Sequence, residues 1–87
     1  MANRLGYEAV FAASAIEFFV LLGKRRQRKL LDRTHELVAD PFLVPDFRTT
    51  DAAGREVFHL VSEEFIFDFW IDHAVKQVVI TEIAELE

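Results

Sequence analysis

The sequence predicts an α+β domain in which two helices pack on one face of a small, mainly antiparallel sheet of about four strands. Three observations indicate this fold. A helical hydrophobic period runs through residues 24–39, strand-like segments fill the last third of the chain, and 87 residues suffice for one domain spanning 1–87. The expected order is strand-helix-helix-strand-strand-strand.

The first strand and helix are predicted from local spacing. Residues 7–12 alternate between apolar and other side chains, which is typical of a strand. Ser14 and Glu17 stand three residues apart, the spacing of a capping box, so a helix is expected from Ala15 to Leu22. Gly23 is the natural break after it.

A second helix is predicted over residues 24–39, because positions i, i+1, i+4, i+7 and i+8 on one helical face carry Leu30, Leu31, Thr34, Leu37 and Val38. Asp40-Pro41 should end it, since the residue before proline is disfavoured in the helical region. Residues 42–54 follow Pro41 and contain Pro45, and they predict a long loop. Four apolar side chains are expected to pin this loop to the core: Phe42, Leu43, Val44 and Phe47.

The last third predicts a three-strand meander over residues 55–61, 65–72 and 77–84, with turns at 62–64 and 72–74. In the middle strand, Phe65, Phe67 and Phe69 share one face with Ile71, which should lie under the helices. The other face should remain open and carry Ile66, Asp68, Trp70 and Asp72, together with His59 if the register allows it.

The composition excludes several classes of protein and of site. With 52% hydrophobic and 29% charged residues, the chain lies outside the range of disordered proteins. It has no Cys, which excludes a disulfide framework, a thiolate zinc site and a Cys nucleophile. The apolar run over residues 9–22 contains Glu17 and is shorter than the ~20 residues of a membrane span. We expect a cytoplasmic protein without a membrane segment.

The two parts of the chain carry opposite charge. Residues 1–33 hold seven Lys/Arg and three Asp/Glu, whereas residues 34–87 hold three and twelve, for a net charge of −5 overall. Such asymmetry permits one basic face on an acidic molecule. The basic run on the second helix predicts contacts to a nucleic-acid backbone through Lys24, Arg25, Arg28 and Lys29, the alternative being a solvated helix face.

The order of the predicted elements, and the residues at which they begin and end, resemble the RelE/ParE superfamily of bacterial toxins over about residues 7–84. The residues that carry the resemblance are the strand Tyr7 to Phe11, Ser14-Ala15 with Phe18-Phe19, Leu22 to Gln27, Leu30-Leu31, Leu37 to Pro41, Gly54-Arg55, Phe65 to Asp72 and Val78 to Ile80. The family includes plasmid-stabilisation toxins of type II toxin–antitoxin modules. RelE-like members cut messenger RNA on the ribosome, and ParE-like members poison DNA gyrase.

The resemblance also implies where an RNA-cleavage site would lie. Such toxins place an Arg after the aromatic residue that opens the third strand, but this chain has Ile66 after Phe65. Their last strand ends in a basic or aromatic cluster, whereas residues 81–87 here are acidic. We therefore expect a degenerate cleavage site. The weak catalytic candidates that remain are His59, Arg55 and Arg48, and spacing supports no Ser/His/Asp constellation.

The expected function is a toxin-family protein that acts chiefly by binding a partner protein. Partners would be a cognate antitoxin or a second copy in a homodimer, bound through Trp70, Ile66, Phe42 and Phe47. The alternatives are an active ribosome-dependent endoribonuclease, a gyrase-binding inhibitor without catalysis, and a structural dimer of unrelated role. No metal and no cofactor are expected, since Asp32, His35 and Glu36 share a helix face without forming a recognised ligand motif.

Overall fold

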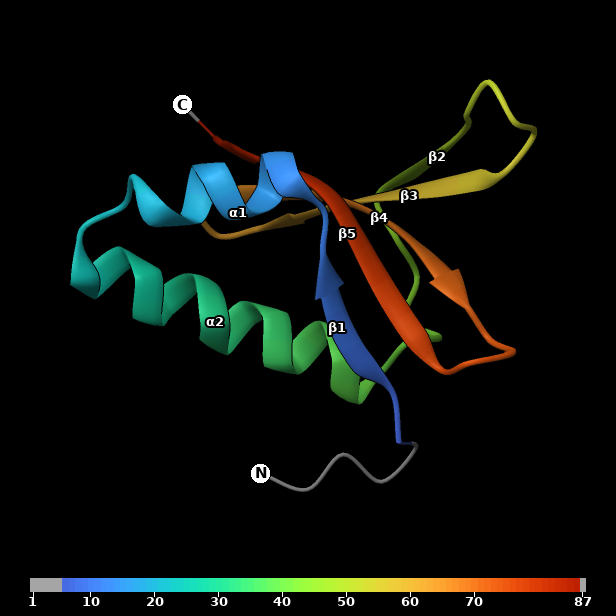
Figure 1. The fold of residues 1–87 in the computed structure, drawn as a ribbon, viewed down its shortest axis with the longest axis horizontal. Helices are drawn as coiled ribbons and strands as arrows, with labels where there is room; N and C mark the ends of the chain where they lie inside the picture. Colours follow the sequence, from blue (N-terminus) through green and yellow to red (C-terminus); the bar gives the residue numbers. More distant parts are fainter. Residues whose placement is uncertain (1–5, 87) are drawn as a thin grey trace.

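The structure, a computed structural model, describes residues 6–86. The elements follow in the order β1 (Glu8–Phe11), α1 (Ala13–Val20), α2 (Lys24–Ala39), β2 (Phe47–Thr50), β3 (Glu56–Ser62), β4 (Phe65–Asp72) and β5 (Gln77–Glu85). The strands form one sheet in the order β1-β5-β4-β3-β2, in which only the β1–β5 pair is parallel. Both helices lie on the same side of this sheet (Figure 1). The predicted α+β class is confirmed.

The second helix has the predicted bounds, but the predicted capping box of the first helix is wrong. Helix α1 begins at Ala13, and its N-cap residue Ala12 makes no side-chain capping bond. The Ser14 hydroxyl instead donates to the carbonyl of Thr81, at 2.8 Å. The reason is tertiary: α1 lies against β5, so a strand carbonyl is within reach of the hydroxyl. Helix α2 ends at Ala39, before Asp40-Pro41, as expected.

The predicted loop over residues 42–54 contains a strand, so the sheet has five strands rather than about four. Strand β2 pairs antiparallel with β3, with Phe47 opposite His59. The expectation that four apolar residues pin this segment is wrong for Phe42, Val44 and Phe47, which are 65%, 84% and 53% exposed. Leu43 alone among the four packs against the core. Backbone pairing to β3 holds the segment in place.

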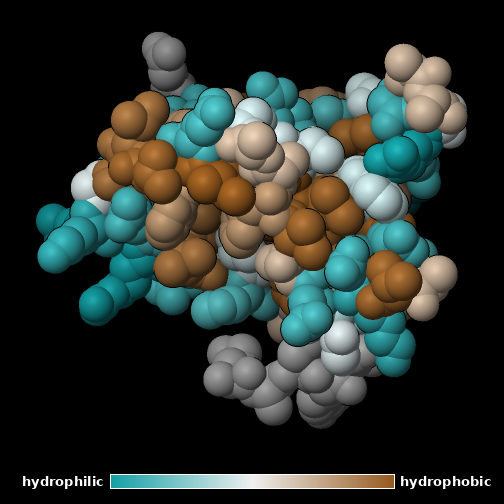
Figure 2. Space-filling view, viewed as in Figure 1, coloured by the Kyte–Doolittle hydropathy of each residue, from teal (hydrophilic) through white to brown (hydrophobic). Residues whose placement is uncertain are grey.

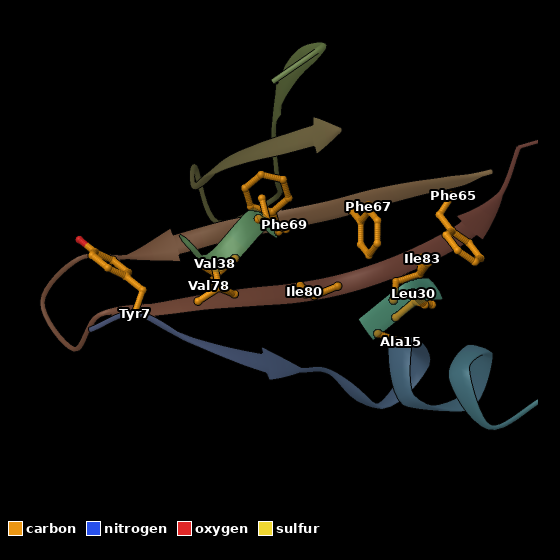
Figure 3. Close-up of a cluster of buried hydrophobic side chains, with 11 residues drawn as sticks. Tyr7, Ala15, Leu30, Val38, Phe65, Phe67, Phe69, Val78, Ile80 and Ile83 are labelled. Atoms are coloured by element: carbon orange, nitrogen blue, oxygen red, sulfur yellow. The ribbon is translucent and has the colours of Figure 1, made fainter. Parts of the chain in front are cut away.

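The core lies between the sheet and the two helices (Figure 3). Phe65, Phe67 and Phe69 are 0%, 0% and 2% exposed, as their alternation predicts. They pack with apolar side chains from α1, α2 and the neighbouring strand, namely Ala15, Leu30, Leu37, Val38, Val78, Ile80 and Ile83. These three rings therefore fix which face of the sheet is covered.

A register shift between β4 and β5 keeps this core continuous. The pairing changes between Asp68 and Phe69, so Phe67 lies opposite Ile83 and Phe69 lies opposite Ile80. Thr81 falls within the irregularity, and its hydroxyl donates to the carbonyl of Asp68 at 3.2 Å. An extra residue of this kind restores the inward direction of later side chains.

Membrane insertion through a helix finds no support in residues 6–86. None of the helices described there has both the length and the apolar character that crossing a bilayer requires.

Candidate functional site on the open face of the sheet

Strand register defines a surface on the side of the sheet away from the helices, which we call the open sheet face. Side chains that lie directly opposite each other on paired strands share a face. His59 is opposite both Phe47 and Asp68, and Trp70 is opposite Val79. By the same pairing, the open sheet face consists of Glu8, Val10, Phe47, Thr49, Val57, His59, Val61, Ile66, Asp68, Trp70, Asp72, Gln77, Val79, Glu82 and Ala84.

A hydrogen-bonded chain of three side chains crosses this face. His59 Nδ1 lies 2.7 Å from Oδ1 of Asp68, and His59 Nε2 lies 2.8 Å from Oγ1 of Thr49. An ionised carboxylate only accepts hydrogen bonds, so with neutral imidazole Nδ1 carries the proton and Nε2 accepts from the Thr49 hydroxyl. The Phe47 ring stacks on the imidazole at 4.5 Å between centroids, 10° from parallel.

The three hydrogen-bonded side chains follow the order hydroxyl, imidazole, carboxylate. The spacing of residues in the sequence does not predict this constellation. Thr49 and Asp68 were absent from the catalytic candidates. Thr49 was missed because residues 42–54 read as a loop, whereas Thr49 lies on β2. The register between β3 and β4 decides that Asp68 and His59 lie opposite each other, and the sequence does not give this register. The arrangement holds one imidazole nitrogen as an oriented proton acceptor, the geometry that general-base chemistry uses.

The three residues predicted as catalytic do not meet at one point. His59 lies on the open sheet face, and the Arg55 guanidinium covers the Trp70 ring on that face, 4.0 Å from its centroid. Arg48 pairs across the strands with Phe58 and therefore faces the other side of the sheet. Its guanidinium lies 5.5 Å from the Phe58 ring centroid and 3.6 Å from Glu56. Arg48 is thus separated from His59 by the sheet itself.

Carboxylates outnumber cations on the open sheet face. Its own strands contribute four of them, Glu8, Asp68, Asp72 and Glu82. The five strands contain a single Lys or Arg, Arg48, and it faces the helix side. Arg55 is supplied from the segment before β3 and is itself 3.9 Å from the Asp51 carboxylate. The face is therefore apolar and acidic, with one cation placed over Trp70.

Basic side chains gather instead on the helix side, where several are neutralised. Arg26 binds Glu64 and Glu85, both at 2.7 Å, and Lys29 binds Glu64 at 3.0 Å. Hydrogen bonds from Lys29 and Arg26 lower the pKa of Glu64, while the Glu85 and Glu64 carboxylates raise the pKa of Arg26. Arg33 binds Glu36 and Glu63 at 2.8 Å each. These ion pairs tie α2 to the β3–β4 turn and to the end of β5.

The predicted nucleic-acid contacts all lie on α2, on the opposite side of the sheet from His59. Lys24, Arg25 and Arg28 are exposed and form no ion pair within residues 6–86, whereas Lys29 is engaged with Glu64. The predicted basic residues and the hydrogen-bonded side chains at His59 therefore cannot contact the same short stretch of a bound nucleic acid.

The structure places three of the four predicted partner contacts on one face. Trp70 and Ile66 are half-buried on β4, and Phe47 lies on β2 of the same face, where its ring stacks on His59. Phe42 is elsewhere: its ring stacks on His73 in the β4–β5 turn, with centroids 5.3 Å apart. Glu87, at the acidic end considered above, lies outside the described residues.

Metal binding has no geometric basis in the part of the chain that the structure describes. No three side chains among its His, Asp and Glu residues are grouped so as to hold an ion. The triplet Asp32, His35 and Glu36 on α2 is not such a group.

Comparisons with known proteins agree on the architecture. The chain matches no family model and none of the curated proteins. Among solved structures it is similar to the isolated RelE toxin of E. coli, with a TM-score of 0.74 and 13% identity, covering 94% of this chain and 86% of that one.

Two further similar structures are toxin–antitoxin complexes. A chain of the RelBE2 complex from Mycobacterium tuberculosis gives a TM-score of 0.71 at 16% identity, with 91% of this chain and 96% of that chain covered. A chain of the archaeal RelE–RelB complex from Pyrococcus horikoshii gives 0.69 at 11% identity, covering 91% and 93%. The sequence resemblance is thus confirmed at the level of architecture: the chain has the fold of the RelE toxins.

Proposed function

We propose that this chain is the toxin-fold component of a bacterial type II toxin–antitoxin module and that it acts chiefly by binding an antitoxin, its RNA-cleavage site being degenerate. Similar chains were crystallised with antitoxins in the M. tuberculosis and P. horikoshii complexes. One observation carries the proposal: His59 on the open sheet face is contacted by the Thr49 hydroxyl, the Phe47 ring and the Asp68 carboxylate, and by no cation.

This chemistry is unfavourable for RNA cleavage. The transition state of phosphoryl transfer develops negative charge, which enzymes stabilise with cations or hydrogen-bond donors. A carboxylate such as Asp68 at about 5 Å from a phosphate costs about 1 kcal/mol even in water, and more where water is excluded. Ile66 and Val61 lie opposite each other near His59, where a phosphate ligand would need to be.

The same chemistry favours a protein segment with basic and apolar side chains. Trp70, Ile66 and Phe47 supply apolar contact area, and aromatic residues of this kind are frequent anchors of protein interfaces. Asp68, Asp72 and Glu82 give the surrounding surface a negative potential, which would orient a basic segment as it approaches. The acidic open sheet face thus supports an antitoxin as partner better than a nucleic acid.

The test is the affinity for the antitoxin encoded in the neighbouring reading frame, measured by calorimetry with purified full-length chains. Trp70→Ala should weaken binding by ~30-fold or more, the effect of an interface anchor worth about 2 kcal/mol. Arg25→Ala, on the far side of the sheet, is the matched control and should bind normally. Equal affinity for the Trp70→Ala variant and the unaltered chain would refute the open sheet face as the binding surface.

A second candidate function, an active endoribonuclease, is favoured by the hydrogen-bonded chain of Thr49, His59 and Asp68. Its His59 Nε2 would accept the proton of a ribose 2′-hydroxyl as the 2′-oxygen attacks the adjacent phosphorus. The bond from phosphorus to the 5′-oxygen of the next nucleotide breaks, which leaves a 2′,3′-cyclic phosphate, and the 5′-oxygen takes up a proton as it leaves. Primer extension on messenger RNA after induction separates the two functions. Strong ribosome-dependent cleavage that disappears in His59→Ala supports the enzyme, and weak or absent cleavage supports the binding function.

A further inference from the structure

An apolar pocket lies on the helix side, away from the open sheet face. Phe11, Ile16, Phe19 and Leu31 line a space of about 120 Å³ where β1, α1 and α2 meet. Ile16 and Leu31 are 49% and 37% exposed, and Val20 beside them on α1 is 60% exposed. Figure 2 shows hydrophobic side chains gathered over this part of the molecule. Exposed apolar side chains around a hollow form a surface that a protein partner can cover.

Charges on the exposed side of α2 are segregated along its length. The first half carries Lys24, Arg25 and Arg28, and the second half carries Asp32 and Glu36. The first turn contains no acidic residue and the last turn no basic one. A helix macrodipole favours the reverse distribution, so this arrangement disfavours the helix in isolation.

Most of these charges form no ion pair in the described part of the chain, although Arg28 and Asp32 are four residues apart on the same helix. Within residues 6–86, Lys24, Arg25, Arg28 and Asp32 form no ion pair, whereas Glu36 binds Arg33 at 2.8 Å. These exposed charges are therefore available for ion pairs with a partner outside the domain.

A second copy of the same helix, running antiparallel, is complementary to this pattern. With a two-fold axis between residues 28 and 32, Arg28 of one copy faces Asp32 of the other, and the same register places Lys24 opposite Glu36. Each pair occurs twice because a two-fold interface uses the same surface on both copies. The two macrodipoles are then also opposed. Leu31 lies beside the axis, next to the apolar pocket.

We propose that the chain forms a two-fold symmetric homodimer through antiparallel packing of α2 on α2, with Arg28 of each copy paired to Asp32 of the other and Leu31 and Ile16 buried between them. A nucleic acid or an acidic peptide on this surface would satisfy the basic half of α2 but would be repelled by Asp32 and Glu36. Only a partner with both signs of charge in opposite order fits the whole helix, and a second copy supplies that order.

Sedimentation velocity of the full chain without antitoxin, at several concentrations, tests the proposal. The unaltered chain should sediment as a dimer. Arg28→Glu and Asp32→Arg should each raise the dimer dissociation constant about tenfold or more, because two attractive pairs become repulsive. An equimolar mixture of the two variants should recover dimers, since the acidic side chain at position 28 of one then faces the basic side chain at position 32 of the other.

Four further variants make the result decisive. Arg28→Glu combined with Asp32→Arg in one chain should also recover the dimer, whereas Leu31→Asp should abolish it in every background. Lys76→Glu and Glu82→Arg reverse charges away from α2 and should leave the dimer unchanged. Circular dichroism checks that each variant folds. Arg28→Glu should not unfold α2, because an acidic side chain in the N-terminal half of a helix interacts favourably with the helix dipole.

Two results would overturn the proposal. One is a monomeric unaltered chain at every concentration. The other is a dimer that the single reversals leave intact, or that they weaken without recovery in the mixture and in the double variant. Because no antitoxin is present, failure here leaves the proposed antitoxin binding through Trp70 untouched.

Discussion

Nδ1 of His59 on β3 lies 2.7 Å from Oδ1 of Asp68, its cross-strand neighbour on β4. Because an ionised carboxylate can only accept, this contact selects the Nδ1–H tautomer of the neutral imidazole. Nε2 is then left as the acceptor that faces Thr49 Oγ1. The relationship orients the only histidine on the open sheet face and leads to the first prediction.

Asp68→Ala should change the tautomer of His59. Without the carboxylate, Nδ1–H of the neutral ring has lost its hydrogen-bond acceptor, so the Nε2–H form should become the main one. Long-range ¹H–¹⁵N correlation spectra of the neutral ring report the tautomer directly. Asp72→Ala, on the same face of β4, is the control and should leave the His59 spectrum as it is. Identical His59 spectra in the Asp68→Ala and unaltered chains would contradict the inferred hydrogen bond.

The Arg55 guanidinium should shield Trp70, the one Trp of the chain, since it covers the ring at 4.0 Å. Arg55→Ala should raise the accessibility of Trp70 to acrylamide, seen as a larger fluorescence quenching constant. The lost cation–π contact should cost about 0.5–1 kcal/mol of stability, as for exposed pairs. Arg48→Ala, which removes a cation from the opposite side of the sheet, should leave the quenching constant unchanged; equal quenching in both variants would count against the contact.

Phe67→Ala should lower the free energy of unfolding by about 3–5 kcal/mol, because the ring is 0% exposed and its loss leaves a cavity in the core. A domain of this size has about 5–10 kcal/mol in total, so the variant lies near the limit of folding. Urea denaturation followed by circular dichroism measures the change. Ile66→Ala, next to it on β4 but on the open sheet face, is the control, and a cost as large as that of Phe67→Ala would mean that the assigned faces are wrong.

Stability should fall in acid partly through Glu64. Lys29 and Arg26 donate hydrogen bonds to its carboxylate and hold its pKa below the ordinary value of 4.5. Since the folded-state pKa is depressed, the contribution is fully present above about pH 4.5 and is lost as the pH falls through the folded-state pKa. Urea midpoints measured between neutral and acidic pH should therefore decline less steeply in Glu64→Gln than in the unaltered chain. Glu82→Gln, outside any ion pair of residues 6–86, should keep the original slope.

Much of the fold could be predicted because several segments carry a long, regular hydrophobic pattern. Helix α2 has the bounds that its period and Asp40-Pro41 predicted, and β4 has the bounds predicted from the alternation of Phe65, Phe67 and Phe69. The covered and open faces of the sheet followed from the same alternation. Burial of apolar area stabilises these elements, and the spacing of apolar residues within each segment indicates which side chains are buried.

The sequence by itself therefore determined the fold class, the core and the two helices, while the tertiary structure decided how separated polar residues meet. Strand β2 has no hydrophobic period and exists through backbone pairing with β3. Ser14 binds a carbonyl 67 positions away, and the Thr49, His59 and Asp68 contact joins three strands. Hydrogen bonds depend on distance and angle, which only the register of the assembled sheet sets.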